Sequence, residues 1–281
     1  MTEPTSEPPV ASSETGGSEV GSSIATSLLS LRNVTKSFGA VEALRRVDLD
    51  VAPGKVTALV GDNGAGKSVL IQTIAGIFPP TSGEMYWRGE QVHVHNPRNA
   101  ADLGIATVYQ DLALCNNLDI VQNMYLGSEL KRHGVLDEIT MELETKRLLA
   151  ELSVTTVQSV RQLVGSLSGG QRQSIAVARA VMHESQLVIM DEPTAALGVS
   201  QTAQVLSLVR TLSERGIAVL LISHNLNDVF SVADYIAVMH LGVLVSSGPI
   251  ANYDTTSAVE LITTGASAKV PSMLVRTGQE G

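Results

Sequence analysis

A glycine-rich loop between a strand-like run and a helix-like run sets the first condition on this fold. Residues 61–68 read Gly-Asp-Asn-Gly-Ala-Gly-Lys-Ser, which is the pattern G-x-x-x-x-G-K-S, between the β-type run 55–60 and the helical run 69–74. Glycines let backbone N–H groups converge on a phosphate, and the start of a helix adds partial positive charge. Lys67 would neutralise the β- and γ-phosphates, and the Ser68 hydroxyl would bind Mg²⁺.

We therefore predict a site for a nucleoside triphosphate and Mg²⁺. The alternative, an ordinary glycine-rich turn, does not explain why a strand and a helix flank the loop in the order that phosphate binding requires. The residues assigned to the nucleotide are Gly61, Asp62, Asn63, Gly64, Ala65, Gly66, Lys67, Ser68 and Val69.

The rest of the chain alternates between β-type runs and helical patterns. Several runs are short and apolar throughout, as expected for parallel strands that helices cover on both faces, so we predict an α/β fold. The predicted strands span residues 28–34, 55–60, 105–109, 187–190, 218–222 and 235–239. Residues 111–165 are more polar and helical, most clearly at 142–149, and are predicted to form an inserted helical subdomain.

Composition limits the partners and the compartment. Nineteen basic residues against 28 acidic ones give a net charge of -9, and aromatic residues make up 3%, which disfavours nucleic acid as a partner. The single cysteine, Cys115, excludes an internal disulfide and fits a reducing cytoplasm. No apolar stretch is long enough for a membrane span. We expect a folded domain over 26–265, a disordered tail over 1–25 without a secretory signal pattern, and a flexible tail over 266–281.

Two acidic residues follow another strand-like run. Residues 187–190 lead directly into Asp191 and Glu192. Ligands bind at the carboxyl ends of strands in open α/β sheets, so these carboxylates should face the same ligand as Lys67. Asp191 would hold Mg²⁺ through water, and Glu192 would act as general base on an attacking water. A solvated acidic turn explains the pair equally well when it is taken alone, and the phosphate loop favours the hydrolytic interpretation.

The sequence Leu-Ser-Gly-Gly-Gln at residues 167–171 forms a second candidate anion site. Ser168 is predicted to cap a helix that continues through 174–180, where exposed N–H groups could touch a phosphate. With the phosphate loop before it and Asp191 after it, this segment resembles the signature of ATP-binding cassette (ABC) ATPases. The resemblance covers about residues 28–247. It implies a P-loop NTPase core of ABC type with an antiparallel β-subdomain and an inserted α-helical subdomain.

The resemblance also implies roles for individual residues. Phe38 matches the aromatic ring placed against adenine, although a core role fits it as well. Gln110 matches the glutamine that approaches the metal and the attacking water, and His224 matches the switch histidine at the γ-phosphate. Lys67, Glu192, Gln110 and His224 would then be catalytic. Ser68, Gln110 and Asp191 would bind the metal, and Ser168, Gly169, Gly170 and Gln171 would contact ATP.

Two features do not follow this pattern. The family commonly has Asp where this chain has Gly198. Either a charged contact between two ATP sites is missing, or a positive φ or a close backbone approach requires glycine there. His93 and His95 would share one face of a possible strand, but no acidic or cysteine partner accompanies them, so we interpret them as structural.

Each motif occurs once, so the resemblance implies a homodimer or a pairing with a second cassette. It further implies membrane permease subunits, an extracytoplasmic sugar-binding protein, and a peripheral position at the cytoplasmic face of the inner membrane. Residues 60–68, 104–110 and 192–198 are similar to those of simple-sugar importer ATPases of the ribose, xylose and fructose type. Alternatives are an importer of nucleosides, amino acids or autoinducers, or a soluble non-transport ABC protein. No Asn-Lys-x-Asp guanine signature is present.

Overall fold

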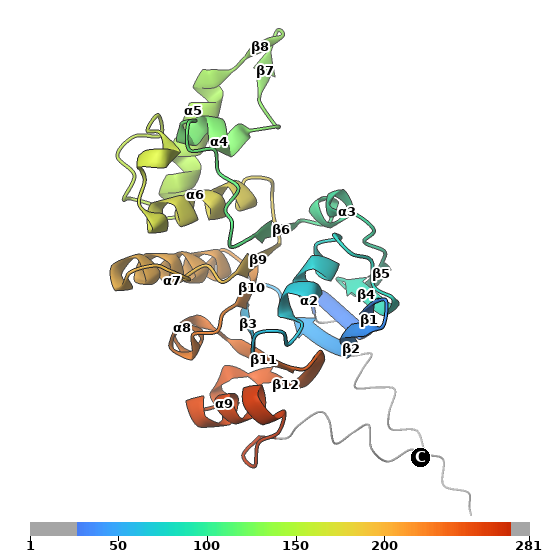
Figure 1. Cartoon of the computed structure of the whole chain (residues 1–281). Helices are drawn as coiled ribbons and strands as arrows, with labels where there is room; N and C mark the ends of the chain where they lie inside the picture. Colours follow the sequence, from blue (N-terminus) through green and yellow to red (C-terminus); the bar gives the residue numbers. More distant parts are fainter. Residues whose placement is uncertain (1–26, 271–281) are drawn as a thin grey trace, which may run out of the picture.

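The computed structural model describes residues 27–270, so the predicted N-terminal tail and most of the predicted C-terminal tail lie outside it (Figure 1). A six-stranded sheet has the order β12-β11-β3-β10-β9-β6, in which all neighbouring strands are parallel except β11 and β12. Its strands are β3 (Val56–Gly61), β6 (Ile105–Val108), β9 (Leu187–Asp191), β10 (Ala218–Ile222), β11 (Tyr235–His240) and β12 (Val243–Pro249). The predicted α/β fold is confirmed.

A second sheet is antiparallel, as the family resemblance implied. It has the order β2-β1-β4-β5, with β1 (Leu29–Phe38), β2 (Val41–Val51), β4 (Ser82–Trp87) and β5 (Glu90–Val92). β1 runs four residues beyond the predicted end at Val34, because its pairing with β2 continues until Phe38 faces Val41. β5 ends at Val92, so the prediction that His93 and His95 share a strand is wrong. Their rings stack with centroids 6.1 Å apart in an irregular segment.

Helices cover both faces of the large sheet. They are α2 (Lys67–Ile74), α3 (Pro97–Asp102), α6 (Gly169–Val181), α7 (Val199–Glu214), α8 (Leu226–Val232) and α9 (Thr255–Thr264), while α4 (Ile120–Tyr125) and α5 (Glu138–Glu151) belong to a segment beside the sheet. Short 3₁₀ turns lie at η1 (Val164–Ser166) and η2 (Ile250–Asn252).

The alternation of side chains along the strands divides the core in two. Every residue of β3 and β10 is buried. On one face, Leu59 and Leu220 pack with α2 and the antiparallel sheet. On the other, Val60 and Leu221 pack with helices α6 to α9. Because successive residues of a strand point to opposite faces, a run that is apolar throughout needs two covering layers, and the sequence supplies both.

A helical segment, residues 111–165, lies to one side of the large sheet (Figure 1). It contains α4, α5 and a hairpin of β7 (Lys131–Arg132) and β8 (Val135–Leu136). α5 includes the amphipathic run predicted at 142–149 and buries Met141, Thr145 and Leu149, which are spaced one turn apart. Within residues 27–270, no helix is both long and apolar enough to cross a bilayer.

Candidate active site

The predicted phosphate loop connects the end of β3 to the start of α2. Gly66 caps α2 with φ 100°, and a Cβ there would lie 2.8 Å from the Ala43 carbonyl oxygen, so glycine is required. The helix has no side-chain cap at this end, which leaves its first N–H groups for a ligand. Ser68, in the first turn, is exposed. The geometry is that of an anion site at a helix N-terminus.

Lys67 is folded back over this loop. Its side chain is buried, and its Nζ donates hydrogen bonds to the carbonyl oxygens of Gly61 (2.8 Å) and Asp62 (3.0 Å). Burial lowers the pKa of the ammonium, while nearby carboxylates, Glu192 foremost, oppose this shift. The two carbonyls hold the ammonium inside the loop, where a phosphate oxygen could replace them as its partner.

The acidic pair lies at the carboxyl end of the same sheet. Asp191 is the last residue of β9, and burial, followed by the nearby Glu192 charge, raises the pKa of its carboxyl. Glu192 follows with φ 48°, and its backbone N–H donates to the Ile222 carbonyl 3.0 Å away on the neighbouring strand β10. Glu192 Oε1 lies 3.1 Å from His224 Nδ1. The parallel pairing of β9 and β10 thus brings together two residues that lie 32 positions apart in the sequence.

A cavity of about 380 Å³ joins the loop to the acidic pair. Sequence reasoning missed part of its wall, namely the start of β2 and the turn between β11 and β12, because neither segment carries a motif. The lining residues are Val41, Glu42, Ala43, Arg45, Asn63, Gly64, Gly66, Lys67, Ser68, Val69, Asp191, Glu192, Leu241 and Gly242. Six of the nine nucleotide residues predicted at 61–69 therefore share one cavity with the predicted acidic pair, and Gly61, Asp62 and Ala65 lie outside the lining.

The donor set of this cavity fits Mg²⁺. The Ser68 hydroxyl and the Asp191 carboxylate both line it, and both are hard oxygen ligands. Within the described part of the chain, no group of three or more His, Cys, Asp or Glu residues could enclose a metal. A cation held by one or two protein oxygens, with phosphate oxygens completing its shell, is the arrangement that Mg²⁺ prefers.

Gln110 and Phe38 lie beside the cavity, outside its lining. Gln110 is exposed, two residues after β6, whose Val108 pairs with Met190 of β9, so it follows the same sheet edge as Asp191. Phe38 is 42% exposed, and Val41, which faces it across the β1–β2 turn, lines the cavity. Gln110 therefore follows the same sheet edge as Asp191, and Phe38 lies across a turn from a lining residue.

The Ser168 loop lies elsewhere, at the start of α6. The predicted cap is confirmed and is reciprocal: Ser168 Oγ accepts from Gln171 N (3.3 Å), and Gln171 Oε1 accepts from Ser168 N (2.9 Å). Gly170 packs so closely that an added Cβ would lie 3.0 Å from Cβ of Gln201 on α7. The loop takes no part in the lining of the Lys67 cavity, so the two predicted anion sites are separate within one chain.

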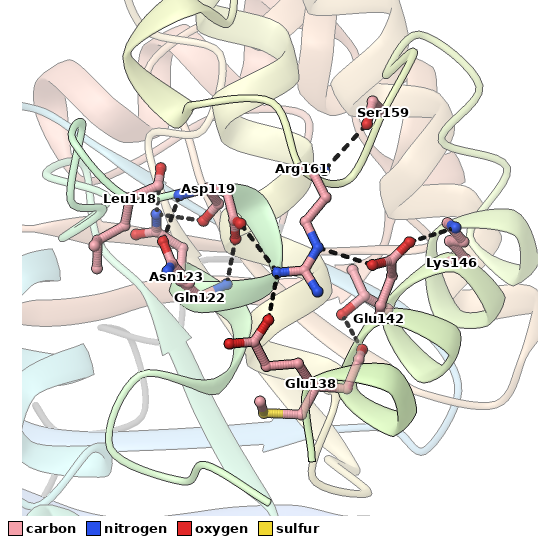
Figure 2. Close-up of polar contacts among 11 residues, drawn as sticks. Leu118, Asp119, Gln122, Asn123, Glu138, Glu142, Lys146, Ser159 and Arg161 are labelled. Atoms are coloured by element: carbon pink, nitrogen blue, oxygen red, sulfur yellow. Dashed lines mark hydrogen bonds and ion pairs between the residues drawn. The ribbon is translucent and has the colours of Figure 1, made fainter. Parts of the chain in front are cut away.

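An ionic network fixes the chain that leads into this loop (Figure 2). Arg161 Nη1 lies 3.4 Å from Asp119 Oδ2 and 3.3 Å from Glu138 Oε2, and its Nε donates to Glu142 Oε2 at 2.8 Å. Asp119 also caps α4, and Glu138 and Glu142 lie on α5. The guanidinium therefore connects both helices to the segment that precedes Ser168.

The structure tests one of the two explanations of Gly198. Its φ is -73° and its ψ is 163°, a conformation open to any residue, and a Cβ added there would have no heavy atom within 4 Å. The idea that a positive φ or a close approach from within the same chain requires glycine is therefore wrong. The explanation by a missing charged contact remains a prediction.

Fold and motif order together define an ATP-binding cassette. The family model for ABC transporters matches residues 44–195. The chain belongs to the ABC transporter family, as an ATP-binding and ATP-hydrolysing cassette.

Its relatives include sugar-import proteins. The fructose import ATP-binding protein FrcA of Rhizobium meliloti is 43% identical over 243 residues, 84% of this chain and 94% of FrcA. The xylose/arabinose import ATP-binding protein XylG of Sulfolobus acidocaldarius is 42% identical over 86% of this chain and 96% of XylG. The ribose import protein RbsA of Yersinia pestis is 37% identical, and the match spans 84% of this chain but 46% of RbsA.

Solved structures agree with this assignment. A nucleotide-free ATP-binding cassette from an ABC transporter is 27% identical, with a TM-score of 0.71 over 79% of this chain and 91% of that one. The ADP conformation of the cassette MJ1267 is 26% identical, with a TM-score of 0.72 over 85% and 95% of the two chains.

Proposed function

We propose that this chain is the energy-coupling ATPase subunit of a bacterial ABC importer for monosaccharides. The observation that carries the proposal is the agreement of the two single-cassette relatives, FrcA and XylG, which are named for import of fructose and of xylose or arabinose and match over nearly their whole length. RbsA, named for ribose import, matches over about half its length. An importer of another solute and a soluble non-transport ABC protein are the competing functions.

In the proposed site, each side chain has one task. Lys67 exchanges the carbonyls of Gly61 and Asp62 for phosphate oxygens of ATP. Ser68, Asp191 and Gln110 would hold Mg²⁺, which when bound neutralises phosphate charge. Phe38 would stack on the adenine.

Hydrolysis requires a base near the γ-phosphate. Glu192 would accept the proton of the attacking water, a role that contributes about 10²- to 10⁴-fold in rate. The contact of 3.1 Å between Glu192 Oε1 and His224 Nδ1 supports a role for the histidine in orienting that carboxylate. His224 is exposed, so its ring remains free to contact the γ-phosphate from the same edge.

The separation of the two anion sites supports a working pair of cassettes. Because the Ser168 loop takes no part in the lining of the Lys67 cavity of its own chain, we propose that it closes the cavity of a second cassette. ATP then holds the two faces together and hydrolysis releases them, which moves the helical segment against membrane permease subunits. The chain would lie at the cytoplasmic face of the membrane, with an extracytoplasmic sugar-binding protein delivering solute to the permease.

The pairing has a direct test. Glu192→Gln keeps the shape of the side chain and removes the base, so ATP should bind without turnover and hold two cassettes together. Size-exclusion chromatography in Mg-ATP should show a dimer for Glu192→Gln. Glu214→Gln, at the exposed end of α7, should behave as the wild type. A fully active, strictly monomeric Glu192→Gln protein would contradict both the base and the pairing.

The import function is tested in the assembled complex. The chain, purified with its permease and binding protein in lipid, should hydrolyse ATP faster when fructose, xylose or ribose is added, and Glu192→Gln should abolish the stimulation. Amino acids and nucleosides serve as comparison solutes. Stimulation by one of these, with none by sugars, would overturn the proposed substrate class and leave the ATPase assignment intact.

A further inference from the structure

Two of the three phenylalanines of this chain contact each other next to the start of β2, which lines the cavity. Phe38 ends β1, and Phe78 follows α2 by four residues. Their ring centroids lie 5.2 Å apart with an angle of 83° between the planes, the edge-to-face geometry that aromatic pairs favour. Phe38 nevertheless remains 42% exposed. An exposed aromatic ring is therefore held from one side by a second ring.

Lys36 completes the group. Its Nζ lies 5.1 Å from the centroid of Phe38 and 5.6 Å from that of Phe78, within the range of a cation–π contact for both rings. The same Nζ donates a hydrogen bond of 2.8 Å to the carbonyl oxygen of Pro79. That bond fixes the ammonium, and it connects β1 to the segment that follows α2. The Phe38 ring is thus restrained by its contacts with Phe78 and Lys36, and Lys36 is itself held by a backbone carbonyl.

Lys36, Phe38 and Phe78 are connected to the nucleotide site in two ways, through β1 and through α2. Phe38 faces Val41 across the turn, and Val41 lines the cavity. The helix that begins with Lys67 ends four residues before Phe78, and Phe78 N bonds back to the Gln72 carbonyl at 3.4 Å. The phosphate loop and the aromatic pair are thus attached to the two ends of one short helix.

We propose that Phe78 and Lys36 are positioning residues for the purine base: they restrain the Phe38 ring so that its open surface is ready to stack on adenine. The inference rests on the proposed role of Phe38. A restrained ring loses little side-chain freedom when the base binds, so affinity rises without any contact between Phe78 and the nucleotide. Loss of this restraint should weaken binding of the base and leave binding of the phosphates unchanged, because the phosphates would lie on the loop of Lys67.

The test compares ATP with inorganic triphosphate, which lacks the base. Dissociation constants of both are measured by calorimetry on the full chain. Phe78→Leu should weaken ATP about threefold to tenfold and leave triphosphate unchanged within about twofold, while Phe78→Tyr retains ATP affinity. Lys36→Met, which keeps the aliphatic stem, should weaken ATP by a smaller factor of about two to five.

Controls separate this proposal from the function on which it rests. Phe230→Leu, on α8 in the other half of the core, should not change the ratio of the two affinities. In the assembled transporter, Phe78→Leu should raise KM for ATP and leave kcat within about twofold. Equal weakening of ATP and triphosphate by Phe78→Leu, or no effect on either, overturns the proposal. If Phe38→Ala leaves ATP affinity intact while Lys67→Ala abolishes it, the assignment of Phe38 to the base is wrong.

Discussion

Gly198 offers a quantitative test because its backbone accepts any side chain and its helix lacks a cap. α7 begins after Gly198 without a side-chain hydrogen bond and without an acidic residue in its first turn, whereas Asp119, Asp137 and Asp254 cap other helices. An aspartate at an N-cap gains a few tenths of a kcal/mol over glycine. Its charge adds about 0.3 to 1 kcal/mol at a helix start. The reduced freedom of the unfolded chain adds about 0.4 to 1 kcal/mol.

Gly198→Asp should therefore stabilise the protein by about 1 to 2 kcal/mol, which corresponds to a rise in Tm of about 2 to 8 °C. Gly198→Ala gains the same stability from reduced freedom of the unfolded chain, but alanine is a poorer N-cap than glycine. The two contributions oppose each other, so the Tm of Gly198→Ala should change little. Differential scanning calorimetry measures both. In steady-state ATPase curves, Gly198→Ala should keep its maximal rate, and Gly198→Asp should alter cooperativity in ATP more than maximal rate. Equal large losses of maximal rate or of Tm in both variants would refute this reasoning.

Two further predictions concern ion pairs outside the nucleotide cavity. Arg161→Met should lower the free energy of unfolding, measured in urea, by about 1 to 2 kcal/mol, since three carboxylates lose a shared partner. The control Arg147→Met breaks one exposed i,i+4 pair with Glu151 and should cost less than about 0.5 kcal/mol, so equal losses in the two variants would contradict the network. The Lys269 ammonium and the Ser257 N–H hold the pKa of Asp254 at about 2, below its ordinary 3.8. This carboxylate therefore contributes stability above about pH 4 that is lost as the pH falls towards about 2, and the difference in urea midpoint between the wild type and Asp254→Asn should shrink over that window.

The elements that the sequence predicted well are those that local chemistry determines. The runs at residues 187–190 and 218–222 are apolar throughout, and the run at 55–60 is apolar except for Lys55 and Thr57; the structure buries all of these residues but Lys55 in the central sheet. The helix after Ser168 was predicted to its first residue because the capping serine and its glycines are contiguous. β2 was not predicted. Bulges in its pairing with β1 interrupt the alternation of apolar and polar residues, and a strand prediction depends on that alternation.

The class of this protein follows from short segments of its sequence, because the phosphate loop, the Ser168 loop and the acidic pair each need only a few adjacent residues in one order. The contacts that functional residues make with residues distant in the sequence depend on the tertiary structure. The contact of Glu192 with His224 depends on the parallel pairing of β9 and β10, and the ring of Phe78 meets Phe38 across 40 positions of sequence. Such contacts depend on strand register and on helix placement, and these are set by burial of the whole core and not by neighbours along the chain.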